Sequence, residues 1–337
     1  MRNIYDLTIK ELEDYFISIN EKKFRAVQVY EALYKRRVTS FDDMTNISKE
    51  VREKLKQDFS FYKIKMLIKQ QGKNVNKYLF ELEDGNKIES VLMFHDYGTS
   101  ICVSSQVGCN MTCAFCESGR LKKVRNLLAY EIVQQILQIE EDINKRITHV
   151  VLMGIGEPFD NYDNVLRFVK IINCGKGIDI GSRHITISTC GVIPGIKKFM
   201  NEEGQVNLAI SLHAPNNILR SRIMPINKAY PLNELMETIK EYINKTNRRV
   251  TFEYIMLDNV NDSEENAKEL ALLLKGINCY VNLIPYNETE NIEFKRTKEW
   301  KIMKFYDILK KNKINVTIRK EFGGSVDAAC GQLRANN

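Results

Sequence analysis

Cys109-Asn110-Met111-Thr112-Cys113-Ala114-Phe115-Cys116 is the stretch around which the rest of the chain is organised. Its cysteines have the spacing C-x3-C-x2-C, which brings three thiols to one side of a helix or a tight loop. Three converging thiolates are typical ligands of a soft metal. A structural zinc site or a closed iron–sulfur cluster would use four protein ligands, whereas three ligands leave one iron open to a substrate. The alternatives are a zinc knuckle that borrows Cys102 and a chance spacing.

The composition is that of a folded, mildly basic protein. The chain has 337 residues, a formal net charge of +7 and 44% hydrophobic residues, enough for one large domain and a smaller one. The basic excess is compatible with a nucleic-acid partner. No apolar run approaches the roughly 18 residues of a membrane span, and the N-terminus is not a signal peptide. We therefore expect a cytoplasmic protein whose eight cysteines are reduced and serve metal or catalytic roles.

The first hundred residues predict two small units. Residues 1–60 have the apolar spacing of three helices, and their charges nearly cancel, so a solvated cap and an RNA-binding surface are both open. In residues 61–98, Asp84-Gly85 separates two alternating runs and predicts a β-hairpin. Glu89 lies on the returning strand of this hairpin, where a glutamate taken alone would face solvent.

From residue 99 to residue 319, strands and helices alternate at intervals of about 30 residues, which predicts a parallel sheet. The predicted strands are Ser100–Ser104, Ile147–Met153, His184–Ser188, Val206–Ser211, Val250–Met256 and Tyr280–Ile284. Six units are too few for a closed eight-fold barrel. The predicted fold is thus α/β, a partial (β/α)6 barrel with an N-terminal helical domain and a small β-hairpin extension. A flat doubly wound sheet is the alternative.

Polar loops follow these strands, at the edge where parallel folds place their chemistry. Gly156 would let the backbone approach a ligand closely, and Glu157 could accept from an ammonium group. Ser188 and Ser211 could bond hydroxyl or carboxylate groups, and Asn287 an adenine or ribose edge. His213 could contact the same ligand, although a buried core histidine is the simpler interpretation of that residue alone.

Two further features are less tied to the sheet. Arg120, Lys122, Lys123 and Arg125 follow the cysteine motif and form either a solvated face or phosphate contacts at the mouth of a site. Cys330 stands in a loop of small residues near the C-terminus. It is either a free core cysteine or a nucleophile that a flexible loop delivers to the site.

Together these stretches resemble the RlmN/Cfr family of radical S-adenosylmethionine (SAM) RNA methyltransferases, and the RlmN type more closely. The resemblance extends nearly end to end. It is carried by Phe24-Arg25-Ala26, Val103 to Cys109, Gly156-Glu157-Pro158, Pro225-Ile226-Asn227, Val281 to Pro285 and Ala328-Ala329-Cys330-Gly331-Gln332-Leu333. It departs from the family pattern at Glu117, where a small neutral residue is more common.

The resemblance implies a [4Fe-4S] cluster held by Cys109, Cys113 and Cys116, and two SAM molecules per turnover. Cys330 would become S-methylcysteine, and a 5′-deoxyadenosyl radical would activate its methyl group for attack on an adenine ring carbon. Glu89 would accept the ring proton, and Cys102 would release the RNA through a transient disulfide with Cys330. The SAM-binding residues implied by the family are Gly156, Glu157, Ser188, Ser211, Leu212, His213 and Asn287.

The same resemblance implies a division into residues 1–60 (RNA-binding helical domain), 61–98 (hairpin), 99–319 (radical SAM barrel) and 320–337 (loop carrying Cys330). It implies methylation of C2 of an adenosine in ribosomal RNA (rRNA) and of the adenosine beside the anticodon in transfer RNA (tRNA). A flavodoxin-like electron donor and a monomeric state are expected. Cfr-type methylation of C8 is the nearest alternative. A non-catalytic zinc and RNA-binding protein using Cys102 and the three motif cysteines is a remote one.

Overall fold

The protein is described by a computed structural model over residues 1–289, 291–319 and 331–333. Two sets of strands form its main sheet. The first set is β6 (Gly98–Cys102), β9 (His149–Leu152), β10 (Ile185–Thr189), β11 (Asn207–Ser211), β12 (Val250–Met256), β13 (Cys279–Pro285) and β14 (Val316–Ile318). The second set is β3 (Lys65–Gly72), β4 (Val75–Glu81) and β5 (Lys87–His95). Both sets belong to one ten-stranded sheet.

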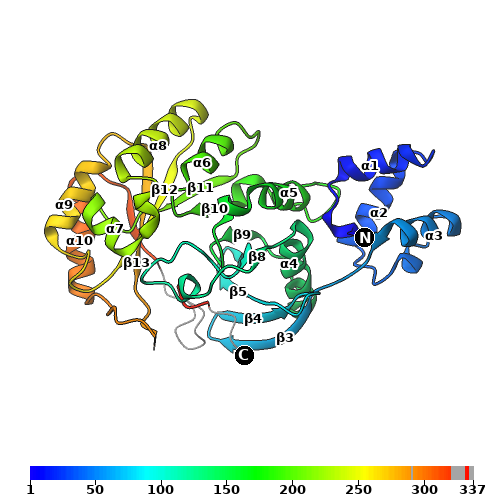
Figure 1. Ribbon diagram of the computed structural model, residues 1–337, viewed down its shortest axis with the longest axis horizontal. Helices are drawn as coiled ribbons and strands as arrows, with labels where there is room; N and C mark the ends of the chain where they lie inside the picture. Colours follow the sequence, from blue (N-terminus) through cyan, green and yellow to red (C-terminus); the bar gives the residue numbers. More distant parts are fainter. Residues whose placement is uncertain (290, 320–330, 334–337) are drawn as a thin grey trace.

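The strand order is β14-β13-β12-β11-β10-β9-β6-β5-β4-β3. Every neighbouring pair from β14 to β6 is parallel, and every pair from β6 to β3 is antiparallel. The sheet is therefore mixed. Because β14 and β3 are its two edges in the part of the chain described, the sheet does not close into a barrel (Figure 1). The predicted α/β class and partial barrel are confirmed.

Helices cover the outer, convex side of the parallel strands (Figure 1). They are α4 (Ala129–Ile143), α5 (Tyr162–Ile172), α6 (Ile193–Phe199), α8 (Leu232–Thr246), α9 (Glu264–Leu273) and α10 (Glu299–Lys311). A short additional helix, α7 (Asn217–Ile223), follows β11 and was not predicted. In a doubly wound sheet the helices would cover both faces, so the flat alternative is wrong. None of the helices in the described ranges is long and apolar enough to cross a membrane.

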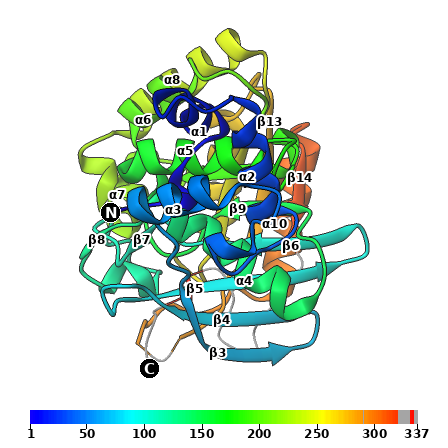
Figure 2. The same cartoon turned by 90° about the vertical axis from the view of Figure 1, so that its right-hand side faces the viewer.

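The hairpin is larger than predicted because β3 precedes it as an edge strand (Figure 2). In β3 three consecutive apolar residues, Met66 to Ile68, are followed by polar ones, so the strand lacks the alternation that marks β4 and β5. One face of β4 and β5 packs on α4. The Tyr78 hydroxyl donates to Asp142 Oδ2 (2.8 Å), and Ser90 Oγ donates to Gln135 Oε1 (2.7 Å). The side chains between these alternate to the opposite face, which is turned toward the barrel interior.

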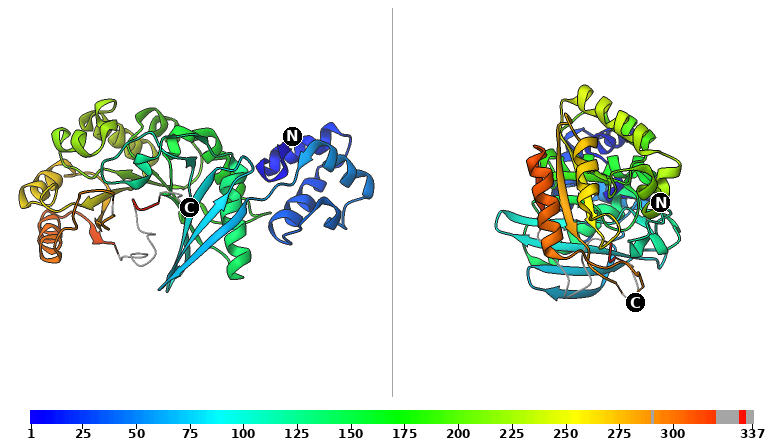
Figure 3. Two further views of the ribbon diagram at one scale, coloured as in Figure 1. Left: turned by 60° about the horizontal axis from the view of Figure 1, so that its bottom comes forward. Right: turned by 90° about the vertical axis from the view of Figure 1, so that its left-hand side faces the viewer.

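The N-terminal helices form a block at one end of the molecule (Figures 1 and 3). This block contains α1 (Ile9–Ser18), α2 (Phe24–Tyr34) and α3 (Lys49–Asp58). The short strand β1 (Arg2–Asn3) pairs with β2 (Phe59–Ser60) and so joins the two ends of the block. Ion pairs attach it to the barrel helices, from Arg37 to Glu140 on α4 and from Arg167 on α5 to Glu11.

Candidate active site

The cysteine motif is a loop rather than a helix, between β7 (Gln106–Val107) and the 3-10 turn η3 (Glu117–Arg120). Backbone hydrogen bonds fix both ends of it, from Cys109 N to Leu121 O and from Ala114 N to Ile223 O (both 2.9 Å). Gly108 precedes the first cysteine with φ +72°, and a Cβ there would lie 2.3 Å from Lys122 O. Hydrogen bonds therefore hold the loop from two sides. Position 108 needs glycine because the backbone of Lys122 leaves no room for a side chain there.

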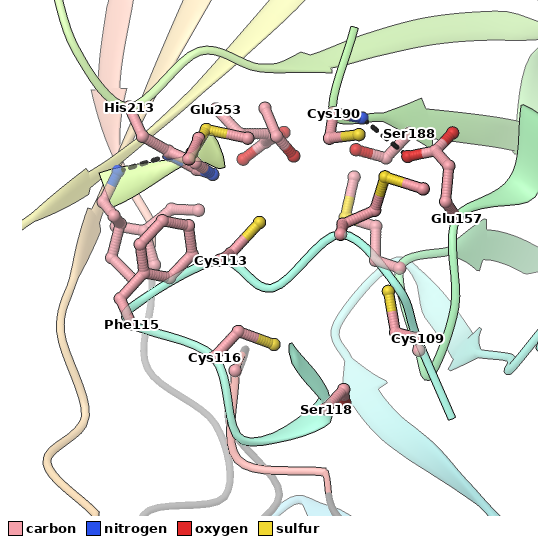
Figure 4. Close-up of a pocket in the computed structure, with 18 of the residues that line it drawn as sticks. Cys109, Cys113, Phe115, Cys116, Ser118, Glu157, Ser188, Cys190, His213 and Glu253 are labelled. Carbon is pink, nitrogen blue, oxygen red and sulfur yellow. Dashed lines mark hydrogen bonds between the residues drawn. The ribbon is translucent and has the colours of Figure 1, made fainter. Parts of the chain in front are cut away.

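The three motif thiols point into one cavity (Figure 4). Burial raises the pKa of Cys109 to about 12, and burial and then the two neighbouring thiols raise the pKa of Cys113. These thiols would ionise only beside a compensating cation, which a [4Fe-4S] cluster supplies. The donor set thus fits such a cluster. Cys102 lies on β6 and is not among the described residues that line this cavity, which argues against the four-cysteine zinc alternative.

The strand ends complete the wall of this cavity. It encloses about 820 Å³ of space, counting its open mouth. Five predicted SAM-binding residues line it together with the thiols: Gly156, Glu157, Ser188, Ser211 and His213. Two others do not. Leu212 is fully buried in the main core, and Asn287 is half-buried just after β13. The structure therefore brings most of the predicted rim to one place.

Glu157 is built into the backbone of this rim. Its Oε1 accepts from Phe159 N (3.0 Å) and its Oε2 from Cys190 N (2.8 Å). Burial raises its pKa. Gly156, with φ +108°, is needed because a Cβ would lie 2.6 Å from Cβ of Gln106. The close approach at this glycine is thus to another strand of the protein, which differs from the expected approach to a ligand.

His213 is both a buried core histidine and a residue of the cavity wall, the two possibilities that its sequence context left open. Its Nδ1 accepts from Ile255 N (3.0 Å), as for a core histidine, while its ring lines the cavity. Burial, and then Arg220, lower its pKa to about 3, so the ring is neutral. With Nδ1 as acceptor, the neutral ring carries its proton on Nε2. The ring also stands edge-on to Phe115 of the cysteine motif, with centroids 4.8 Å apart.

Arg220 is a structural part of the site that the sequence did not reveal. It lies on α7 and is completely buried. Its guanidinium donates to the backbone oxygens of Cys190 (2.6 Å), Ser211 (3.2 Å) and Leu212 (3.2 Å), which lie at the ends of β10 and β11. Only the fold brings these carbonyls together, so no sequence motif signals this role. Cys190 and Glu253 are two more cavity residues that sequence analysis did not assign.

Glu89 is 3% exposed, so the solvent-facing interpretation of this strand glutamate is wrong. Val91, two residues on, pairs with Cys102 across β5 and β6. Cys102 packs in one buried cluster with Val91 and Leu333, a residue near the end of the chain. Cys330 lies outside the described residues.

The end of the chain is also bonded to the cysteine loop. Glu117 N donates to Gly331 O (2.7 Å), and Ser118 Oγ donates to Leu333 O (2.6 Å). Glu117 itself is buried, and its Oε2 accepts from Asn291 Nδ2 (3.4 Å). The unusual acid after the cysteine motif therefore forms internal contacts, and the turn that contains it anchors the residues that directly follow Cys330.

The basic run after the motif is only partly available to a nucleic acid. Lys123 Nζ lies 2.6 Å from Asp160 Oδ2. Arg125 forms ion pairs with Asp84 and Glu131. These two carboxylates, Glu131 most strongly, raise the pKa of the Arg125 guanidinium. Arg120 donates to the backbone oxygen of Asn291. Lys122 is exposed. Internal ion pairs thus account for Lys123 and Arg125, and Lys122 is the clearest candidate for a phosphate contact.

This fold and site define a radical SAM methyltransferase. Residues 103–271 match the radical SAM superfamily, and residues 2–60 match the N-terminal domain of ribosomal RNA large subunit methyltransferases. The structure superposes on a radical SAM methyltransferase from Sphaerobacter thermophilus with a TM-score of 0.94 and 41% identity, covering 100% of both chains. Streptococcus suis SuiB, at 16% identity and a TM-score of 0.51 over 67% of this chain and 51% of its own, shares the fold.

Curated relatives narrow the class. The chain is 53% identical to a probable dual-specificity RNA methyltransferase RlmN from Spiroplasma citri, over 100% of this chain and 98% of the relative. It is 54% identical to the Enterococcus faecalis protein of the same name, over 99% and 96%. The chain belongs to the RlmN family. It is a SAM-dependent RNA methyltransferase whose cofactors are a [4Fe-4S] cluster and SAM.

Proposed function

We propose that the protein methylates C2 of an adenosine in the peptidyl-transferase region of 23S rRNA and of the adenosine next to the anticodon in tRNA. The names of its relatives as dual-specificity enzymes support two RNA substrates. The observation that carries the proposal is one face of the hairpin. Glu89 and Cys102 share this face, and Cys102 packs there in one cluster with Leu333. Met153 packs on the same cluster and also lines the thiol-lined cavity.

In this proposal each residue has a separate task. Cys330 accepts a methyl group on sulfur and becomes S-methylcysteine, Glu89 takes the adenine ring proton, and Cys102 attacks the Cys330 sulfur to form the transient disulfide. When bound, the cluster and two SAM molecules supply the methyl group and the one-electron chemistry. Cys109, Cys113 and Cys116 hold the cluster. SAM is held by Gly156, Glu157, Ser188, Ser211, Leu212, His213 and Asn287.

The partners follow from the same proposal. The N-terminal block of residues 1–60 contacts the RNA, residues 61–98 and 99–319 form the catalytic body, and residues 320–337 carry the methyl carrier. A flavodoxin-like protein supplies electrons to a monomeric enzyme in the cytoplasm.

Mass spectrometry of nucleosides from treated rRNA and tRNA tests the proposal directly. Reconstituted enzyme, SAM and a reductant should give 2-methyladenosine in both RNAs. A single 8-methyladenosine product in rRNA would instead favour the Cfr-type reaction, and methylation of only one RNA would remove the dual specificity.

A further inference from the structure

A buried ion pair joins β4 to β5. Lys77 Nζ lies 2.8 Å from Glu89 Oε1, and their side chains are only 10% and 4% exposed. Removing two charges from water costs more free energy than an exposed pair recovers, so buried pairs are weak evidence for a purely stabilising role. An ion pair in such a place therefore points to a use for one of its charges.

The pair lies on the hairpin face that is turned toward the barrel interior. In the strand register Lys77 pairs with Val91, and Val91 pairs with Cys102, so all of these side chains share one face with Glu89. Val91 and Cys102 pack against Leu333. The titratable or charged side chains that the register assigns to this face in β3 to β6 are Lys65, Lys77, Glu81, Lys87, Glu89, His95 and Cys102, and His149 on β9 follows beside Ser100.

We propose that Lys77 is a positioning residue for proton removal from the adenine ring. Its ammonium holds the Glu89 carboxylate in one orientation on this buried face. This inference rests on the proposed function, in which Glu89 is the base. In the step concerned, C2 of the adenine carries both its hydrogen and the carbon that is bound to the Cys330 sulfur. The C–H bond at C2 breaks, its electron pair stays with the ring, and the proton passes to a carboxylate oxygen of Glu89. The product is a carboxylic acid beside an ammonium, and this step needs no oxidant.

The geometry predicts what the loss of Lys77 does. The ammonium contacts one carboxylate oxygen of Glu89 at 2.8 Å, and this contact fixes the direction in which the carboxylate points. A general base must lie within hydrogen-bond reach of the proton that it removes, so a carboxylate that is free to turn away should accept the ring proton less often.

The experiment compares Lys77→Met, Lys77→Gln and Lys77→Arg in the cluster-loaded, full-length enzyme. Methylated RNA and 5′-deoxyadenosine are measured together, because SAM cleavage does not need Glu89. We expect Lys77→Met and Lys77→Gln to lose about tenfold in methylation rate, because the base is no longer held in place. SAM cleavage should be unchanged, and Lys77→Arg should behave as the parent.

The hairpin offers a matched control. Lys69 on β3 pairs with Asp142 of α4 (2.6 Å) and packs over the Tyr78 ring, on the opposite face of the same strands. Lys69→Met should leave the methylation rate unchanged. In a Glu89→Gln background, Lys77→Gln should cause no further loss, because Lys77 is proposed to act only through Glu89.

Three results would overturn the inference, and a fourth would overturn its foundation. A loss of methylation in Lys77→Gln that is matched by an equal loss of SAM cleavage, or that adds to the loss in Glu89→Gln, would show that the pair only supports the sheet. Full activity of Glu89→Gln would instead refute the base assigned in the proposed function. Failure of both Lys77→Met and Lys77→Gln to fold, with Lys77→Arg folded, would also count for a structural pair.

Discussion

The parallel and antiparallel strands of the one sheet carry different kinds of side chains. In the parallel part, Glu157, Ser188 and Ser211 stand at strand ends around the motif thiols. In the antiparallel part, Glu89 on β5 and Cys102, where β6 pairs with β5, share one strand face, and Cys102 packs there with Leu333. Parallel strands share one edge, where loops converge, whereas antiparallel strands present a continuous face. We therefore expect the parallel part to serve the cofactors and the antiparallel part to act on the RNA.

Loss of a cluster ligand should have the largest effect. We expect Cys113→Ala to remove bound iron, SAM cleavage and RNA methylation together, because two thiolates do not hold a four-iron cluster. Iron analysis and 5′-deoxyadenosine release after anaerobic reconstitution measure this. Cys174→Ala, at a half-buried cysteine outside the cavity, is the control and should keep full iron content. Full iron in Cys113→Ala would refute the site.

Cys102→Ala should separate the two parts of the sheet. We expect SAM cleavage to continue while methylated RNA is not released, because no thiol remains to attack the Cys330 sulfur. An RNA–protein adduct should accumulate, and peptide mapping after nuclease digestion should place it on Cys330. Normal turnover in Cys102→Ala, or an adduct at another residue, would contradict the division of labour between the two parts.

The two parts also differ in how well the sequence predicts them. The parallel strands have apolar cores and loop motifs at regular intervals, so β12 was predicted with its observed bounds and most of the rim was named. The hairpin face was not visible in the same way. The alternation of side chains identifies the two faces of a strand but does not tell which face other parts of the chain cover. Glu89, considered by itself, was therefore expected to face solvent. Glu89 lies on the hairpin face opposite α4, in contact with Lys77, and only the tertiary fold shows that this face is also covered.

Arg220→Met tests whether the parallel part needs more than its ligands. Removing the guanidinium takes away the hydrogen bonds that Arg220 donates to the backbone oxygens of Cys190, Ser211 and Leu212. Each buried oxygen left unsatisfied lowers the free energy of unfolding by about 1–3 kcal/mol. We expect the free energy of unfolding to fall by at least about 3 kcal/mol and SAM affinity to fall, with RNA affinity unchanged. Arg222→Met, exposed on the same helix, should change stability by less than about 0.5 kcal/mol. Equal SAM affinity in both variants would count against a positioning role.

The pH dependence of stability should report His213. Its pKa is lowered to about 3 in the folded chain, against about 6.5 when unfolded. Between these values the unfolded chain binds more protons, so this contribution is full above about pH 6.5 and is lost as the pH falls toward 3. We expect a loss of about 2 kcal/mol between pH 7 and pH 5. His213→Asn keeps an acceptor for Ile255 N and tolerates the positive φ of 57°, and should flatten this part of the curve. An unchanged curve would contradict the neutral, buried ring.

The smallest effect should come from Lys122, in the basic run that follows the cysteine motif. Each phosphate contact contributes about 0.7 to the slope of log affinity against log salt for single-stranded nucleic acid. Lys122 is exposed, so Lys122→Gln should flatten this slope by about 0.7 if the lysine contacts a phosphate. Lys123 is already held by Asp160, so Lys123→Gln should leave the slope nearly unchanged. Fluorescence anisotropy of labelled RNA at several salt concentrations measures both. Because the two lysines are adjacent, a general loss of positive charge would affect them alike, and only a direct contact separates them. An unchanged slope in Lys122→Gln would return this run to an ordinary solvated surface and move the RNA contact to the N-terminal block.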